Sequence, residues 1–219
     1  MLVLASASPR RRELLRQAGY TFEVRPADIA EDPLPGEDAI NYVTRLAREK
    51  AESVYRQLTG TGHALGNLRL DGDSLTVLGA DTTVVVDNKI LAKPESAADA
   101  ARMLRMLSGR SHRVVTGVAL VTEAATEVAA EVTAVRFRTL SDEEIASYVA
   151  TGEPMDKAGA YGIQGRAARW IPRIDGCYFN VMGLPLALVS AMLEARIPSA
   201  PHHATEGTPE QSPLPTVAP

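Results

Sequence analysis

Hydroxyl and arginine side chains gather near the start of the chain, where a short apolar run is followed by a helical pattern. Residues 2–5 predict a strand, and Ser8-Pro9 predicts the N-cap and first position of a helix. Free backbone N–H groups and the positive end of the helix dipole suit such a junction to anions. The arginines at 10–12 oppose that dipole, and an anionic ligand would relieve them. The segment is a candidate phosphate site; an ordinary capped helix with solvated arginines is the alternative.

Two charged residues further along the chain have apolar surroundings. At about 100° per residue, the helix predicted for residues 37–58 places Lys50 inside its apolar stripe. Such a lysine either snorkels to solvent or borders a cleft that needs a cation. Asp81 carries the only charge in residues 76–86, which otherwise predict a pair of buried strands. A buried carboxylate needs a partner, a lysine or a metal ion, so Asp81 is a candidate metal ligand or base.

Weaker signals accompany these residues. Lys93 precedes a proline and is typical of an exposed loop, whereas Glu31 or Asp28 could join Asp81 around a hard cation, which prefers oxygen ligands. Three glycines spaced by three in residues 156–165 match neither a dinucleotide fingerprint nor a Walker A loop. Within this stretch, Gln164 offers a donor and an acceptor to the edge of a nucleobase, although a plain flexible loop is the alternative.

Short β-forming runs alternate with helical patterns before residue 198, which predicts one compact α/β unit over residues 1–197. Asp87-Asn88 predicts a hairpin turn, and the last helix is expected over residues 183–195. Residues 198–219 hold six of the 14 prolines and few large apolar residues, so we expect a disordered tail. The polar, glycine-rich residues 59–74 predict a surface loop.

Composition excludes several classes of protein. A net charge of −4 argues against a nucleic-acid partner, and a single cysteine, Cys177, excludes a disulfide framework. No apolar run has the ~20 residues of a membrane span, and the apolar start is too short for a signal peptide. The expectation is a cytoplasmic protein with no membrane or nucleic-acid partner.

Seven stretches of the chain contain most of these residues. They are SASPRR at 6–11, LAREKA at 46–51, GADTTVVVDN at 79–88, LAKP at 91–94, LSG at 107–109 followed by His112, DKAGAYGIQG at 156–165 and VMGLPL at 181–186. Together these stretches resemble the Maf family of nucleoside triphosphate pyrophosphatases. They occur in the family's order, cover most of residues 1–195, and are highly specific as a set. The loop at 59–74 is longer than the family usually has, and the tail has no counterpart.

The resemblance implies a mixed α/β sheet in a single elongated, bilobed domain of the Maf/ITPase type, with a nucleotide-binding cleft. It implies that Asp81 is catalytic and that a divalent cation, Mg²⁺ or Mn²⁺, is required and held by Asp81 and Glu31. It also implies a substrate-binding set consisting of Ser6, Arg10, Arg11, Lys50 and Lys93. Water would then attack the α-phosphorus and pyrophosphate would leave. Family members are also similar in forming homodimers.

The same resemblance indicates the substrate. Arg10, Thr82 and Gln164 match the positions that mark the branch acting on dTTP and UTP, and the branch acting on 7-methyl-GTP looks different at all three. We therefore expect hydrolysis of dTTP, UTP and modified pyrimidine triphosphates in a house-cleaning role. The alternatives are a regulator of septum formation that binds nucleotides without turnover, a nucleotidyltransferase, and a pyrophosphatase for 7-methyl-GTP.

Overall fold

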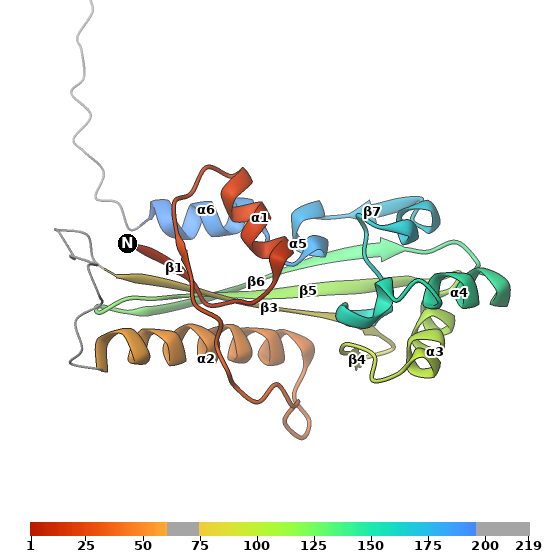
Figure 1. The fold of residues 1–219 in the computed structure, drawn as a ribbon, viewed down its shortest axis with the longest axis horizontal. Coiled ribbons are helices and arrows are strands. Elements are labelled where there is room, and N and C mark those ends of the chain that lie inside the picture. Colours follow the sequence, from red (N-terminus) through yellow and green to blue (C-terminus); the bar gives the residue numbers. More distant parts are fainter. Residues whose placement is uncertain (61–74, 196–219) are drawn as a thin grey trace, which may run out of the picture.

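The computed structural model describes residues 1–60 and 75–195, which form an elongated mixed α/β domain (Figure 1). Within them, one seven-stranded sheet has the order β2-β1-β3-β5-β6-β7, and β4 also pairs with β3. β1 is parallel to β2 and β3, and the remaining pairs are antiparallel. The strands are β1 Leu2–Leu4, β2 Glu23–Val24, β3 Thr76–Val86, β4 Lys89–Leu91, β5 Ser111–Val121, β6 Thr126–Arg136 and β7 Arg173–Asp175. The mixed α/β sheet in a single domain is confirmed.

Helices lie on both faces of this sheet. Figure 1 shows α2 along one face, α1, α5 and α6 over the other, and α3 and α4 at the far end from the N-terminus. The α-helices are α1 Pro9–Gln17, α2 Ala39–Gly60, α3 Ala97–Leu107, α4 Asp142–Val149, α5 Tyr178–Met182 and α6 Leu186–Glu194. Three 3₁₀ helices follow α4: η1 Glu153–Asp156, η2 Ala158–Ala160 and η3 Arg166–Trp170. No helix in the described residues is both long and apolar enough to cross a membrane.

Glycines in the middle of the long strands let α2 lie unusually close to the sheet. A Cβ atom at Gly79 would lie 2.0 Å from the carbonyl oxygen of Ala47, and one at Gly117 would lie 2.3 Å from that of Val43. No side chain fits there, so these glycines fix the distance between α2 and the strand centres. Because Gly117 is the register partner of Asp81, this close packing sets where α2 stands relative to that carboxylate.

The apolar core is divided between the two ends of the molecule. One cluster surrounds α3 and α4 and includes the fully buried Trp170. The other clusters lie around β1, α1, α2 and α6. β3 supplies side chains to both ends, with Leu78 in one cluster and Val84 in another. A single sheet therefore joins two packed ends, and the candidate functional site described below lies between them.

Some predicted elements differ from those observed. The segment predicted as a pair of strands is one eleven-residue strand, β3. The helix predicted for residues 183–195 is confirmed as α6, but its predicted start is wrong: Gly183, at φ 106°, ends the short helix α5, and α6 begins after Pro185. The hairpin turn is confirmed, with positive φ at Asp87 and Asn88. The predicted tail lies outside the described residues, as does most of the predicted loop, although α2 continues to Gly60.

Candidate functional site

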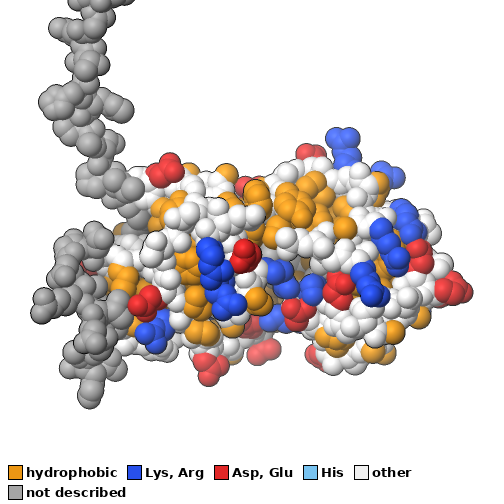
Figure 2. Space-filling model, turned by 45° about the horizontal axis from the view of Figure 1, so that its top comes forward, with side chains coloured by type: hydrophobic (Ala, Val, Ile, Leu, Met, Phe, Trp, Pro, Cys, Tyr) orange, Lys and Arg blue, Asp and Glu red, His pale blue; other side chains and the backbone are white. Residues whose placement is uncertain are grey.

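One cavity of about 770 Å³ collects the site residues that the resemblance implies, whereas Asp28, the alternative to Glu31, is not among its lining residues. It lies between the β1–α1 junction and α2 on one side and residues 153–165 on the other. Figure 2 shows charged side chains of both signs meeting near the middle of this face. The predicted residues that line the cavity are Ser6, Arg10, Arg11, Glu31, Lys50, Asp81, Thr82, Lys93 and Gln164. Residues separated by more than 150 positions in the chain thus share one site.

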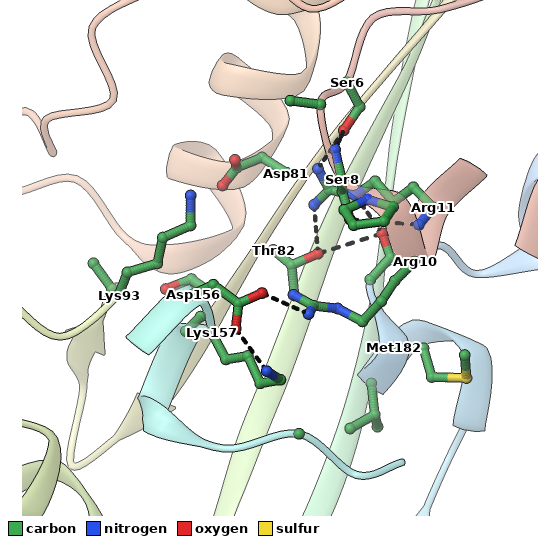
Figure 3. A pocket seen from close by; sticks show the side chains of 18 of the residues that line it. Ser6, Ser8, Arg10, Arg11, Asp81, Thr82, Lys93, Asp156, Lys157 and Met182 are labelled. Atoms are coloured by element: carbon green, nitrogen blue, oxygen red, sulfur yellow. Dashed lines mark hydrogen bonds and ion pairs between the residues drawn. The ribbon is translucent and has the colours of Figure 1, made fainter. Parts of the chain in front are cut away.

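The β1–α1 junction turns Arg11 back toward the cavity. The side chain of Ser8 caps α1 and Pro9 is its first residue, as the sequence predicts. Arg11 donates through Nε to the carbonyl oxygen of Gly183 at 2.7 Å, through Nη1 to Ser6 Oγ at 3.2 Å, and through Nη2 to Thr82 Oγ1 at 2.9 Å (Figure 3). All three acceptors are neutral.

The charge of Arg11 therefore has no carboxylate in direct contact among the described residues. Burial lowers the pKa of Arg11, and the nearby Asp81 only partly offsets this. A guanidinium has five N–H donors, and three are used, so one remains on each terminal nitrogen. A buried, uncompensated cation with two free donors is suited to a phosphate group.

Lys50 lies between two carboxylates. Its Nζ is 2.6 Å from Asp81 Oδ1 and 2.5 Å from Glu31 Oε1. The side chains of Lys50 and Asp81 are 9% and 10% exposed, whereas that of Glu31 is 46% exposed. Lys50 thus does not snorkel to solvent: it borders the cleft, and it is the structural partner of Asp81.

Glu31 is held in place by both its backbone and its carboxylate. Burial by itself would raise the pKa of Glu31, but the hydrogen bond and charge of Lys50, with help from Lys93 and Arg11, hold it below its ordinary value. Tyr42, on α2, donates its hydroxyl to the Glu31 carbonyl oxygen at 2.8 Å, and burial raises the pKa of Tyr42 to about 12. Glu31 is therefore ionised at neutral pH and fixed beside Asp81.

These two carboxylates fit the cation that the resemblance implies. The described part of the chain has no group of three or more histidine, cysteine or acidic side chains arranged to hold a metal ion by themselves. Asp81 and Glu31 nevertheless contact one nitrogen, so their oxygens converge on a single point. Two carboxylates completed by phosphate and water oxygens suit Mg²⁺ or Mn²⁺, which prefer hard oxygen ligands and retain several waters.

Two further cations approach the cavity from different elements. Lys93, just after β4, is exposed and makes no ion pair among the residues described, and in Figure 3 it points into the cavity. Arg10 contacts Asp156 at 3.1 Å, and the other oxygen of Asp156 contacts Lys157 at 2.6 Å. Asp156 and Lys157, which the sequence did not assign, therefore connect α1 to the glycine-rich segment.

The glycines of residues 156–165 leave space that other side chains of the same protein occupy. A Cβ atom at Gly165 would lie 1.7 Å from Glu153 Oε1, an oxygen that also accepts the hydroxyl of Tyr148 at 2.9 Å. Gly159, at φ 68°, packs against Val84. The segment is thus a packed turn and not an open loop. It holds Gln164 exposed at the edge of the cavity.

A buried histidine anchors the same segment. Nε2 of His112, on β5, is 2.7 Å from the hydroxyl of Tyr161, which lines the cavity. Burial lowers the pKa of His112 to about 4, so the imidazole is neutral at pH 7. Sequence reasoning gave Tyr161 no role; the only signal was a large aromatic residue among glycines. Cys177 is half-buried and is not among the residues that line the cavity.

Comparisons with known proteins identify relatives over most of the chain. The family model described as Maf-like protein matches residues 1–196. A protein named dTTP/UTP pyrophosphatase from Koribacter versatilis is 51% identical over 192 residues, covering 88% of this chain and 92% of that protein. Proteins of the same name from Aromatoleum aromaticum and Photobacterium profundum are 50% and 48% identical, over 89% and 88% of this chain and 94% and 95% of their own lengths.

Proposed function

This chain belongs to the Maf family, and we propose that it is a nucleoside triphosphate pyrophosphatase that hydrolyses dTTP and UTP to the nucleoside monophosphate and pyrophosphate. The observation that carries the proposal is the convergence of three kinds of group in one cavity. Arginine and lysine side chains can bind a triphosphate, two carboxylates can hold a cation and water, and an exposed amide can select a base.

The triphosphate is bound by cations from two separate elements. Arg10 and Arg11 come from α1 and Lys93 from the end of β4, all lining the cavity. Because Arg11 already has its guanidinium fixed by neutral acceptors, it offers its two free N–H groups without reorganising. These cations offset the charge that pyrophosphate acquires as the α–β phosphoanhydride breaks.

The carboxylates act at the reacting phosphorus. A bound Mg²⁺ or Mn²⁺ would neutralise negative charge on the phosphate oxygens. Asp81 and Glu31 would hold it, and Asp81 orients a water toward the α-phosphorus. The water oxygen forms the new bond to phosphorus, its proton passes to Asp81 or solvent, and the bridging oxygen leaves with pyrophosphate. Lys50 keeps the two carboxylates together before the substrate arrives.

The base is selected at the other side of the cavity. Gln164 and Arg10 line both the main cavity and a smaller adjoining hollow of about 410 Å³. The Gln164 amide has one donor and one acceptor side, which pair with the alternating edge of uracil or thymine. A base that covered these groups without pairing them would lose about 1–3 kcal/mol of binding free energy. This loss is enough for roughly tenfold discrimination between bases.

A panel of nucleoside triphosphates tests the proposal. The purified chain is incubated with dTTP, UTP, GTP and 7-methyl-GTP, each with Mg²⁺ or Mn²⁺ and with EDTA, and monophosphate and pyrophosphate are both quantified. We expect equal amounts of both products, fastest from dTTP and UTP, and none with EDTA. Binding without turnover would indicate a regulator, turnover only with a second acceptor would indicate a nucleotidyltransferase, and faster turnover of 7-methyl-GTP would contradict the proposed substrate.

A further inference from the structure

A line of buried polar groups runs from the cavity into the sheet behind Arg11. Thr82 Oγ1, on β3, accepts from Arg11 Nη2 at 2.9 Å and is 2.9 Å from Thr116 Oγ1 on β5. Thr116 Oγ1 is 3.1 Å from the backbone carbonyl oxygen of Asn180 in α5. Thr116 and Asn180 are fully buried, and neither lines the cavity.

Resting on the proposed function, we propose that Thr82 and Thr116 are positioning residues that aim Arg11 at the triphosphate. The resemblance expects Thr82 to help select the base. Its contacts indicate instead that it acts on the substrate through the guanidinium. Thr116, which nothing in the sequence pattern had marked, then determines how Thr82 can act.

The direction of each hydrogen bond follows from the chemistry of its two ends. A guanidinium only donates, so the Thr82 oxygen must accept from Arg11. A backbone carbonyl only accepts, so Thr116 must donate its single hydroxyl hydrogen to Asn180. The contact between the two threonines therefore has one possible direction, from the Thr82 hydroxyl to the Thr116 oxygen. Each hydroxyl donates once and accepts once, and neither can rotate without losing a bond.

The far end of this line is fixed as well. The side-chain amide of Asn180 donates to the carbonyl oxygen of Val114 at 3.0 Å and to Thr133 Oγ1 at 2.9 Å. Asn180 is thereby tied to β5 and β6, so its own carbonyl oxygen stays in place as the last acceptor. The orientation of Arg11 is thus set by the rigid sheet and not by the exposed loops.

Removing the Thr116 hydroxyl would leave Thr82 with a poor choice of acceptor. Among the described residues, the only other acceptor within reach of the Thr82 hydroxyl is the carbonyl oxygen of Gly183, 3.5 Å away, which already accepts from Arg11 Nε at 2.7 Å. If Thr82 turned toward Gly183, it would compete with Arg11 for that oxygen. The guanidinium would then lose its fixed plane, and its two free N–H groups would no longer be preorganised.

The test compares Thr116→Val with Thr116→Ser and with a matched control, Thr133→Val. Thr133 is also fully buried, lies on the neighbouring strand, and makes two hydrogen bonds, to the Cys177 carbonyl and with the Asn180 amide. The two valine variants therefore lose equal numbers of bonds at equal burial, and similar losses of melting temperature are expected. Thr133→Val removes one of the two hydrogen bonds of the Asn180 amide, but the bond to the Val114 carbonyl oxygen remains, and only Thr116→Val interrupts the line between Asn180 and Arg11.

Two readouts distinguish positioning from packing. For Thr116→Val we expect kcat/KM to fall about tenfold for dTTP, UTP and GTP alike, with the ratio between bases unchanged, because Arg11 contacts phosphate. Thr116→Ser, which keeps the hydroxyl, should restore at least half of the loss, and Thr133→Val should stay within about twofold of the wild type. Affinity for inorganic pyrophosphate, measured by calorimetry, should fall by a similar factor in Thr116→Val alone.

Several results would overturn the proposal. They are wild-type kcat/KM in Thr116→Val, a loss that differs between dTTP and GTP, an equal loss in Thr133→Val, or unchanged pyrophosphate affinity. The pyrophosphate measurement needs no turnover. If the wild-type chain hydrolysed no triphosphate, the proposed function would fail, while the positioning of Arg11 would still stand or fall on pyrophosphate binding.

Discussion

Replacing Lys50 by methionine should destabilise the fold by about 3 kcal/mol at pH 7, because it leaves Asp81 buried and without its partner. Removing one member of a buried ion pair typically costs about 3–5 kcal/mol, and both side chains are at most a tenth exposed. The contact with Glu31 adds at most about 1 kcal/mol, because that side chain is 46% exposed and screened by solvent. Methionine keeps the packing of the lysine stem, which places the total at the lower end of the range.

The dependence of this difference on pH follows from Glu31. In the wild type the pKa of Glu31 is lowered: Lys50 outweighs burial, which by itself would raise it. Its contribution to stability is therefore present above the unfolded pKa of about 4.3 and is lost as the pH falls through the folded value. In Lys50→Met burial remains without Lys50, so the pKa of Glu31 rises and ionisation opposes folding. The gap in unfolding free energy between the two proteins should shrink as the pH falls from 7 toward 4.

Urea unfolding of both proteins at pH 7 and at mildly acidic pH measures this difference, and Lys93→Met is the matched control. Lys93 lines the same cavity but is exposed and has no ion pair in the described residues, so its replacement should change stability by less than about 0.5 kcal/mol. The melting temperature of Lys50→Met should fall by about 6–12 °C. Equal stability of the two variants at pH 7 would refute the pairing of Lys50 with Asp81.

Three further substitutions test separate parts of the site. Asp81→Asn should lower turnover of dTTP at least about 100-fold while the chain stays folded by circular dichroism; residual turnover near the wild-type rate would remove its assigned role. Gln164→Ala, at an exposed position, should leave the melting temperature unchanged and reduce the preference for dTTP over GTP about tenfold in competition assays. An unaltered preference would show that the amide does not read the base. Gly165→Ala should cost about 1–3 kcal/mol in urea unfolding because its Cβ would meet Glu153 Oε1. Gly60→Ala, where an added Cβ would meet no other part of the described chain within 4 Å, is its control and should not destabilise the fold; equal effects would mean that the turn is not packed as described.

Local patterns predicted the elements that position the site. Ser8 and Pro9 defined the start of α1, and the apolar periodicity of α2 placed Lys50 among buried positions. The isolation of Asp81 in an apolar strand marked it as a residue that needs a partner. Capping, amphipathicity and the exclusion of lone buried charges act over a few residues, so they can be recognised in a single sequence.

Contacts between distant segments could not be predicted in this way. The helical projection left open whether Lys50 reaches solvent or a cleft, because the answer depends on Glu31 and Asp81 approaching from other elements. β7 is three residues long, and its pairing with the end of β6 has no local signal. The division between α5 and α6 was missed because Gly183 was read as the start of a helix although it ends one.

Polar groups buried behind the site were also missed. Thr116 lies in a strand of β-forming residues, where threonine is an ordinary choice. His112 has no neighbouring residue in sequence that suggests Tyr161 as its partner, 49 positions away. The sequence could show which side chains face the substrate, but which groups hold them depends on the register of β3 with β5.

Hydrolysis of dTTP in ¹⁸O-labelled water tests the central claim most directly, because the position of the label identifies the phosphorus that water attacks. The purified wild-type chain is incubated with dTTP and Mg²⁺, and the products are separated and analysed by mass spectrometry. Attack at the α-phosphorus predicts one ¹⁸O atom in dTMP and unlabelled pyrophosphate. Label in pyrophosphate would mean attack at the β-phosphorus, and dTDP with labelled inorganic phosphate would mean attack at the γ-phosphorus. The first result would contradict the proposed attack at the α-phosphorus, and the second would contradict the assignment of this cavity as a pyrophosphatase site.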